Sequence, residues 1–284
     1  MIDPKWKYII PKYVNRTVVY ALLIILSLFV IFPLLWIIST SFKPANEVMS
    51  IPPRWIPDHP TLENYINVLT NSSIPRHFLN SVLVSSIVAV VSVLAGGVTG
   101  YGLARRKSRG TSGISMFILG SQMLPATVVM VPLYLFISRF ELYDTVFGLA
   151  LAHLTLTMPL VTWLCKGYID TIPIDLEEAA QMEGCSRLQA LRLVILPIAA
   201  PGVAAAGMYA FVQSWNEFTL ASVLTASDKS RTLPIGLTEF ASLFKIDWGS
   251  TMAASVIISI PVIIIFFFMQ KYIVGGLAQG AVKG

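Results

Sequence analysis

Six long stretches of this chain carry almost no charge, and they constrain its fold more than any other feature. The uncharged windows span residues 17–42, 78–104, 111–138, 145–165 and 248–270, and one more window, 193–227, contains a single charged residue, Glu217. A helix needs about 20 apolar residues to cross a bilayer, and it satisfies its own backbone hydrogen bonds there. The pattern therefore predicts an all-α membrane protein with six transmembrane helices.

The composition excludes a soluble domain. The chain of 284 residues is 55% hydrophobic but only 12% charged, whereas soluble domains are about 25% charged. Its first apolar window follows Lys5, Lys7, Lys12 and Arg16, so a cleaved signal peptide has to be considered. The window is longer than the core of a signal peptide. We therefore expect it to remain as a membrane anchor.

The basic residues in the loops predict the orientation of the chain. With the N-terminus in the cytoplasm, the cytoplasmic segments hold 13 Lys and Arg and the outer loops hold 7. Lys and Arg are enriched in cytoplasmic loops, so both termini and the loop at 166–192 are predicted to be cytoplasmic, and the net charge of +5 does not require nucleic acid. The predicted divisions are a cytoplasmic N-terminus (1–16), a first transmembrane helix (17–42), a five-helix transmembrane domain (78–272) and a cytoplasmic tail (273–284).

The loop at residues 173–197 has the pattern of two short helices joined by a tight turn. Asp175 followed by Glu178 is typical of an N-cap with its capping-box partner, and Ser186 with Gln189 repeats the pattern. Each pair predicts the start of a helix.

The residues between and after these pairs predict where the two helices end. Gly184 suits the left-handed conformation that ends a helix, and Pro197 is expected to stop the second helix. Ala179 and Ala180 leave little bulk on the first helix, so another surface could approach it closely. A DNA-binding helix-turn-helix is the alternative, but an acidic first helix and only two arginines in the second do not suit phosphate contacts. The pattern favours a rigid unit that docks onto another protein.

The same loop resembles the EAA loop of ATP-binding-cassette importer permeases, whose pattern is E-A-A, three residues, G, nine residues and I-x-L-P. Here the motif reads Glu178-Ala179-Ala180, then Gly184, then Val194-Ile195-Leu196-Pro197. Val194 in place of isoleucine is the sole departure. The motif covers 20 positions at fixed spacing, which makes the resemblance specific.

Shorter patterns extend the resemblance to the carbohydrate-importer branch, similar to the maltose-type second permease subunit. They are SFKPANE at 41–47, TLENY at 61–65, GYGLARRK at 100–107, SWNEF at 214–218, RTLPIGL at 231–237 and GLAQGAVKG at 276–284. The resemblance implies the type I importer fold, with six transmembrane helices and a cytoplasmic coupling helix. It also implies a permease subunit of a binding-protein-dependent sugar importer in the cell membrane, with an oligosaccharide as the expected substrate.

The resemblance also implies partners and the residues that meet them. The expected partners are a second homologous permease subunit, two ATPase subunits, an extracytoplasmic solute-binding protein, the sugar and membrane lipid. The loop residues expected to couple to an ATPase are Glu178, Ala179, Ala180, Gly184, Leu196 and Pro197. The tail residues expected at the ATPase interface are Gln279, Gly280, Ala281, Val282 and Lys283.

The sequence predicts no catalytic site and no bound cofactor. It contains no G-x-x-x-x-G-K-[ST] motif, which forms the phosphate-binding loop of many ATPases. ATP and Mg²⁺ are therefore expected on the partner subunits, and the chain is not expected to be an enzyme by itself. Cys165, Cys185 and the scattered histidines have no metal-ligand spacing, so no metal site is predicted.

Glu217 is the one charged residue inside an apolar window, and such residues are functional candidates. It lies 20 residues beyond Pro197, or about 30 Å along a helix, which would carry it to the outer interface. We expect a gate or docking role for Glu217 beside Trp215 and Asn216. A side chain extended to the lipid edge is the alternative.

Other polar and small residues inside the windows have two possible roles. They are Gln122, His153, Thr155, Thr157 and Gln213, which could line a sugar path or bond neighbouring helices together. Gly96 and Gly100 predict a close helix contact. The alternative function is an ion-coupled secondary transporter, which predicts carboxylates near the membrane midplane.

Overall fold

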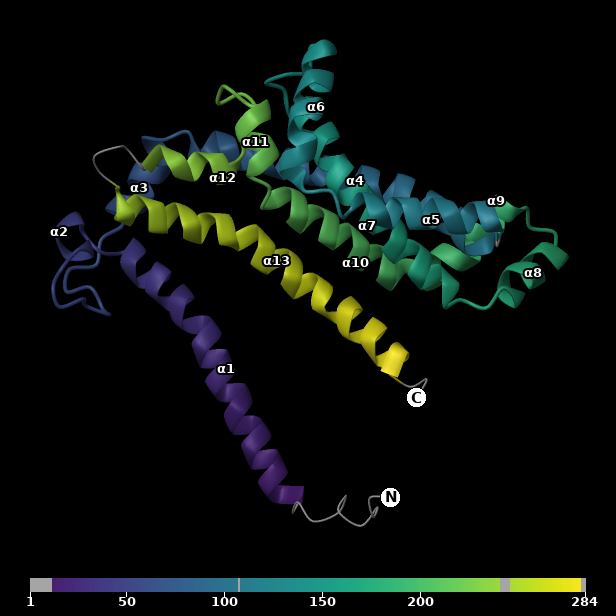
Figure 1. Cartoon of the computed structure of the whole chain (residues 1–284). Helices are drawn as coiled ribbons and strands as arrows, with labels where there is room; N and C mark the ends of the chain where they lie inside the picture. The colour runs from purple at the N-terminus through teal and green to yellow at the C-terminus, as the bar shows by residue number, and fades with distance from the viewer. Residues whose placement is uncertain (1–11, 107, 241–245, 282–284) are drawn as a thin grey trace, which may run out of the picture.

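The computed structural model describes residues 12–106, 108–240 and 246–281, and most of them are helical (Figure 1). The all-α prediction is confirmed. The longer helices are α1 (Lys12–Ser41), α4 (Ile74–Arg105), α5 (Arg109–Ser121), α6 (Ala126–Arg139), α7 (Val146–Asp170), α10 (Leu196–Trp215) and α13 (Trp248–Ala281). The short ones are α2 (Ala45–Val48), α3 (Glu63–Thr70), α8 (Asp175–Met182), α9 (Arg187–Ala190), a π-helical turn (Leu191–Ile195), α11 (Thr219–Leu224), α12 (Leu233–Gly236) and a 3-10 turn (Leu237–Phe240).

Helices α4, α7 and α10 pack side by side as the centre of the bundle (Figure 1). Small residues bring α4 against α7: a Cβ atom added to Gly100 would lie 2.9 Å from the carbonyl oxygen of Thr162. Gly96 meets the same turn of α7, since its added Cβ would lie 3.2 Å from the amide nitrogen of Thr162. The predicted close contact of Gly96 and Gly100 is confirmed. These glycines bring the backbones together, so van der Waals contacts hold the pair.

Helix α1 departs from this bundle and meets it near the start of α13 (Figure 1). None of the most apolar stretch of α1 is buried, and Phe29 is 77% exposed. Only 11% of the corresponding stretch of α13 is buried. An apolar surface of this extent belongs in lipid or against another protein.

The predicted count of six spans is confirmed with α5 and α6 counted together as one bent span. Five helices are long and apolar enough to cross a membrane, whereas the window at 111–138 forms α5 and α6, which are bent by 98° to each other. The break lies at residues 122–125, with Gln122 as the C-cap of α5 and Pro125 as the N-cap of α6. Proline disfavours helical backbone in the residue before it, so Pro125 interrupts the helix.

The bundle has two distinct ends. Helices α4, α7 and α13 run toward the end that carries α8 and α9, and α1 and α10 run toward the end that carries α3 and α12 (Figure 1). We call residues Asp175–Ala190 the elbow and the end that carries them the elbow end. The other is the opposite end. The alternating directions are those of successive membrane crossings, with α5 and α6 together supplying the return from α4 to α7.

Candidate functional sites at the two ends of the bundle

The elbow is held in shape by a left-handed glycine and a helix cap. Gly184 has φ +95° and follows α8 directly, and the amide of Cys185 donates to the carbonyl oxygen of Ala180 at 3.0 Å. In the capping box, the Gln189 amide donates to Ser186 Oγ at 3.3 Å, and the Ser186 amide donates to Gln189 Oε1 at 2.7 Å. Both predictions, the glycine turn and the second capping box, are confirmed.

The prediction of a capping box formed by Asp175 and Glu178 is wrong. Residue Ile174 already has helical backbone angles, so Asp175 is the first residue of α8 rather than its cap, and its side chain accepts no capping hydrogen bond. The amides of Glu177 and Glu178 instead donate to the carbonyl oxygen of Ile174 at 2.9 and 3.1 Å. The three carboxylates in this first turn still lie where the helix dipole favours negative charge.

Pro197 does not stop the second helix as predicted. Helix α9 continues through the π-helical turn Leu191–Ile195 into α10, where Pro197 lies in the first turn. Proline inside a helix removes a donor and crowds the preceding turn, and the wider π turn accommodates this change. The elbow is therefore continuous with α10.

The elbow presents an exposed surface with both acidic and apolar side chains. Of the predicted coupling residues, Glu178, Ala179, Gly184, Leu196 and Pro197 are exposed, whereas Ala180 is buried. Met182 is 88% exposed and Leu188 is 74% exposed. Sequence reasoning missed these two residues, although large apolar side chains in an otherwise polar loop are a usable signal.

A buried polar cluster joins the elbow to the end of α4, and it too was missed. Glu177 is only 5% exposed. Its Oε2 lies 2.9 Å from Arg105 Nε, and its Oε1 accepts a hydrogen bond from the Tyr101 hydroxyl. Arg105 Nη1 also donates to the carbonyl oxygen of Ile169, in the last turn of α7, at 3.3 Å. We call Tyr101, Arg105 and Glu177 the α4–α8 tie.

At the opposite end, Glu217 is buried, and both of its carboxylate oxygens have partners. It follows the end of α10, and its carboxylate accepts the amides of Leu220 and Ala221 at 2.8 and 3.1 Å, which caps α11. Its Oε2 also lies 3.2 Å from His153 Nε2. The alternative of a carboxylate extended to the lipid edge is wrong, because the side chain is 7% exposed. The helix cap and the contact with His153 hold the side chain inside the protein.

The two residues before Glu217, Trp215 and Asn216, lie in different environments. Trp215 is 1% exposed, stacks on Phe211 with ring centroids 5.6 Å apart, and donates from Nε1 to the carbonyl oxygen of Ile258 at 3.3 Å. Asn216, in contrast, is exposed. Within this trio, only Asn216 presents a side chain to the surface.

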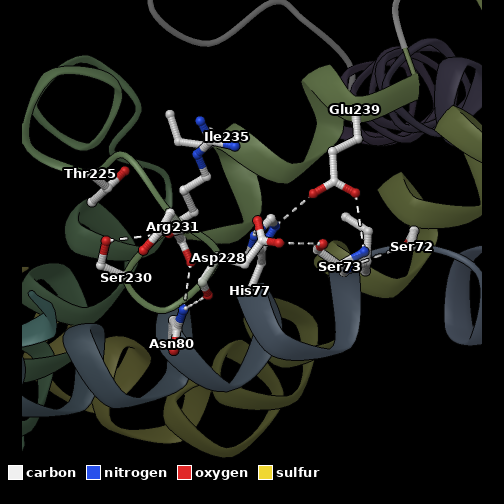
Figure 2. A network of polar contacts seen from close by, with 12 residues as sticks. Ser72, Ser73, His77, Asn80, Thr225, Asp228, Ser230, Arg231, Ile235 and Glu239 are labelled. Carbon is white, nitrogen blue, oxygen red and sulfur yellow. Dashed lines mark hydrogen bonds and ion pairs between the residues drawn. The ribbon is translucent and has the colours of Figure 1, made fainter. Parts of the chain in front are cut away.

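Figure 2 shows a second polar network at this end, centred on His77 at the start of α4. His77 is fully buried, with Nε2 3.2 Å from Asp228 Oδ1 and Nδ1 3.3 Å from Glu239 Oε1. Ser73 holds both carboxylates: its hydroxyl donates to Asp228 at 3.0 Å and its amide donates to Glu239 at 3.1 Å. Hydrogen bonds from Ser73 and His77 lower the pKa of Asp228 below its ordinary value.

The side chains of His77, Asp228 and Glu239 form a close group. The possible ligand atoms of His77, Asp228 and Glu239 lie within 4.8 Å of one another, a proximity that the sequence did not predict. The two carboxylates, however, face opposite ring nitrogens, and one metal ion bonds to one of them.

Asp144, in the connection between α6 and α7, holds a third polar network at this end. Its carboxylate accepts the amides of Ala226 and Ser227 at 2.8 and 3.0 Å, together with the hydroxyls of Ser227 and Ser230. Burial alone would raise the pKa of Asp144, but these hydrogen bonds outweigh burial and hold the pKa well below its usual range. The network fixes the segment after α11 against the start of α7.

The polar residues predicted inside the apolar windows divide between the two roles. His153 bonds α7 to α10 through Ser214 Oγ at 2.8 Å, and Thr157 bonds α7 to α4 through Ser92 Oγ at 3.0 Å. These two join helices. The other three are exposed: Gln122, Thr155 and Gln213. Gln122 Nε2 also donates to the carbonyl oxygen of Leu156 in α7 at 3.2 Å.

The predicted tail is partly helical. The backbone of Gln279, Gly280 and Ala281 completes the last turn of α13. Val282 and Lys283 lie outside the described residues.

Comparison with known proteins identifies the family. Residues 92–279 match the family described as the binding-protein-dependent transport system inner membrane component. The diacetylchitobiose uptake system permease protein DasC of Streptomyces coelicolor is 33% identical over 261 residues, which cover 92% of this chain and 95% of that protein. The trehalose/maltose transport system permease protein MalG of Thermococcus litoralis is 34% identical, over 92% of this chain and 94% of that protein.

A solved structure shares the fold. It is the crystal structure of a bacterial ABC transporter involved in the import of alginate, which aligns with a TM-score of 0.80 at 23% identity and covers 93% of this chain and 98% of that chain. With the family match over two thirds of the sequence, the apolar helices and the elbow, this likeness leads to one conclusion: the chain is a multi-pass membrane protein that belongs to the family of binding-protein-dependent transport permeases.

Proposed function

We propose that this chain is a permease subunit of an ATP-driven, binding-protein-dependent sugar importer, with an oligosaccharide as substrate. The observation that carries the proposal is the elbow, a preformed helix–turn–helix unit with an exposed EAA segment that is continuous with α10. Such a unit can receive a movement from another protein and pass it to the bundle. The family match and the sugar-transporting relatives support the same function.

The proposed assembly contains this chain, a second homologous permease, two ATPase subunits and an extracytoplasmic solute-binding protein. In it, the elbow and both termini face the cytoplasm, as the distribution of basic residues predicts. ATP and Mg²⁺ bind to the ATPase subunits. Glu178 and the apolar residues Met182 and Leu188 are the contacts we propose for the ATPase, because they are exposed on the elbow.

The alternative, an ion-coupled transporter, finds less support. Such transporters use carboxylates or broken helices around an ion site near the midplane. The bent pair α5 and α6 is a broken span, but neither helix contains Asp or Glu. In the described parts of α1, α4, α7, α10 and α13, the carboxylate residue is Asp170, in the last turn of α7. Glu217 lies beyond the end of α10 and is occupied as a helix cap.

The test is reconstitution of the complete transporter in vesicles, with sugar uptake and ATP hydrolysis measured together. Wild-type vesicles are expected to take up an oligosaccharide only with ATP and the binding protein. Gly184→Pro should abolish uptake while leaving the chain in the membrane, because proline cannot adopt φ +95°. Gly184→Asn is the matched control, since asparagine tolerates left-handed backbone. Uptake by Gly184→Pro equal to that of wild type would contradict the coupling role of the elbow.

A further inference from the structure

We infer that the α4–α8 tie positions the elbow, so that a movement of α8 reaches α4 directly as well as α10 through the chain. This inference rests on the proposed function, because it concerns how the elbow transmits a movement that an ATPase supplies. It begins from two adjacent acidic residues of α8 that have opposite environments. Glu178 is exposed, whereas Glu177 is 5% exposed.

The orientation of α8 explains why Glu178 is exposed and Glu177 is buried. Successive residues of a helix point about 100° apart, so Glu178 can face a partner while Glu177 faces the bundle. Glu177 then lies against α4, with Arg105 Nε at 2.9 Å and the Tyr101 hydroxyl on its other oxygen. The two carboxylate oxygens thus have two separate partners on α4, four residues apart, which restricts the rotation of α8.

The tie is sheltered from water, which makes it sensitive to the loss of one charge. The side chain of Arg105 is 14% exposed and that of Glu177 is 7% exposed. Removing one member of such a pair leaves the other charge buried and unpaired, which costs far more than the loss of an exposed ion pair. Arg105 also donates to the carbonyl oxygen of Ile169 at 3.3 Å, so it connects α4, α7 and α8 at one point.

Two routes connect the elbow to the bundle. One is covalent, from α9 through the π-helical turn into α10. The other is the tie, and in the part of the chain that the structure describes, Glu177 makes the side-chain hydrogen bonds and the ion pair that join α8 to another long helix. Apolar packing of Ala104, Ile172 and Ile195 lies beneath it. Without the tie, a movement of α8 would reach α10 but would lose its polar connection to α4.

The test uses the complete transporter in vesicles and compares Glu177→Gln with Glu183→Gln. Both variants remove one negative charge near α8, but Glu183 is exposed. The readout is sugar transported per ATP hydrolysed, because a role confined to folding would lower the amount of transporter and leave this ratio unchanged. We expect the ratio to fall about tenfold in Glu177→Gln, within the usual range of coupling between sites, and to stay at the wild-type value in Glu183→Gln.

Two further variants separate charge from geometry. Tyr101→Phe removes one hydrogen bond but keeps the ion pair, so its ratio should fall less than that of Glu177→Gln. The exchange variant that combines Glu177→Arg with Arg105→Glu restores opposite charges, so its ratio should exceed that of either single change.

Three outcomes would overturn the inference. They are an unchanged ratio in Glu177→Gln, an equal fall in Glu183→Gln, and a loss of assembled transporter that accounts for the whole loss of uptake. If wild-type vesicles themselves take up no sugar, the proposed function fails, and that result is distinct from these three.

Discussion

The two ends of this molecule are built differently. The opposite end is connected by several polar networks, in which Asp144, Glu217 and His77 each join segments far apart in the sequence. The elbow end has an exposed helical unit that is joined to α4 through the buried carboxylate of Glu177. The difference indicates a fixed frame at one end and, at the other, a unit that is rigid within itself and held by few contacts.

The largest effect on stability is expected at the fixed frame, from Glu217→Ala. The change leaves His153 buried without its charged partner and removes the cap of α11. Each buried group left without its hydrogen-bond partner costs about 1–3 kcal/mol, and several are left at once, so the thermal unfolding midpoint of the purified transporter should fall sharply. Glu217→Gln is the control, because its single amide oxygen still accepts one of the two backbone amides. A midpoint unchanged in Glu217→Ala would contradict the account of this end as a fixed frame.

A smaller loss is expected from Asp144→Asn. The amide keeps the size of the carboxylate but loses the charge that accepts two backbone amides and two hydroxyls. Leaving such donors poorly satisfied costs about 1–3 kcal/mol. Limited proteolysis of the segment after α11 measures the effect directly, and cleavage at the wild-type rate would show that Asp144 does not hold this segment.

The pH dependence of the same variant sharpens the prediction. Because the pKa of Asp144 is lowered in the folded protein, its stabilising contribution is complete above the ordinary aspartate pKa and is lost only as the pH falls through the folded value. The difference in the free energy of unfolding between wild type and Asp144→Asn should therefore be the same at about pH 8 and about pH 5.5. Both pH values exceed the ordinary aspartate pKa of about 3.9. A smaller difference in the free energy of unfolding at the lower pH would contradict the claim that the hydrogen bonds lower the pKa of Asp144.

The smallest effect on stability is expected on the surface of the elbow, from Met182→Ser and Leu188→Ser. Both side chains are largely exposed, and surface changes of this kind stay within about 0.5 kcal/mol. The same variants should weaken the binding of the ATPase subunits, which pull-down from detergent extracts measures. A loss of stability together with unchanged ATPase binding would contradict the proposal that these residues contact the ATPase subunits.

The local features of this structure were predictable from the sequence. Gly184 takes its left-handed angle, Ser186 and Gln189 form their capping box, and Gly96 and Gly100 bring α4 to α7. Each depends on residues within a few positions or on a small-residue spacing, which sequence shows directly. The apolar windows likewise predicted the long helices, because length and hydropathy are enough to define a membrane span.

The features that the sequence did not predict depend on long-range contacts or on two sequence signals that favour different structures. Glu177 and Glu178 are identical in type and adjacent, and only the position of Arg105, 72 residues earlier, decides which of them is buried. His77 meets Asp228 across 151 residues, so no spacing in the sequence indicates their contact. At Pro125 the apolar pattern predicted one continuous span, and the backbone restriction imposed by proline prevailed.

Hydrogen exchange tests the contrast between the two ends most directly, in the assembled wild-type transporter and in Glu177→Gln. If the tie holds the elbow, the amides of α8 and the following turn should exchange faster in the variant, while those of α11 should keep the wild-type rate. Exchange that is unchanged in α8, or that rises equally at both ends, would contradict an elbow held to the bundle through Glu177.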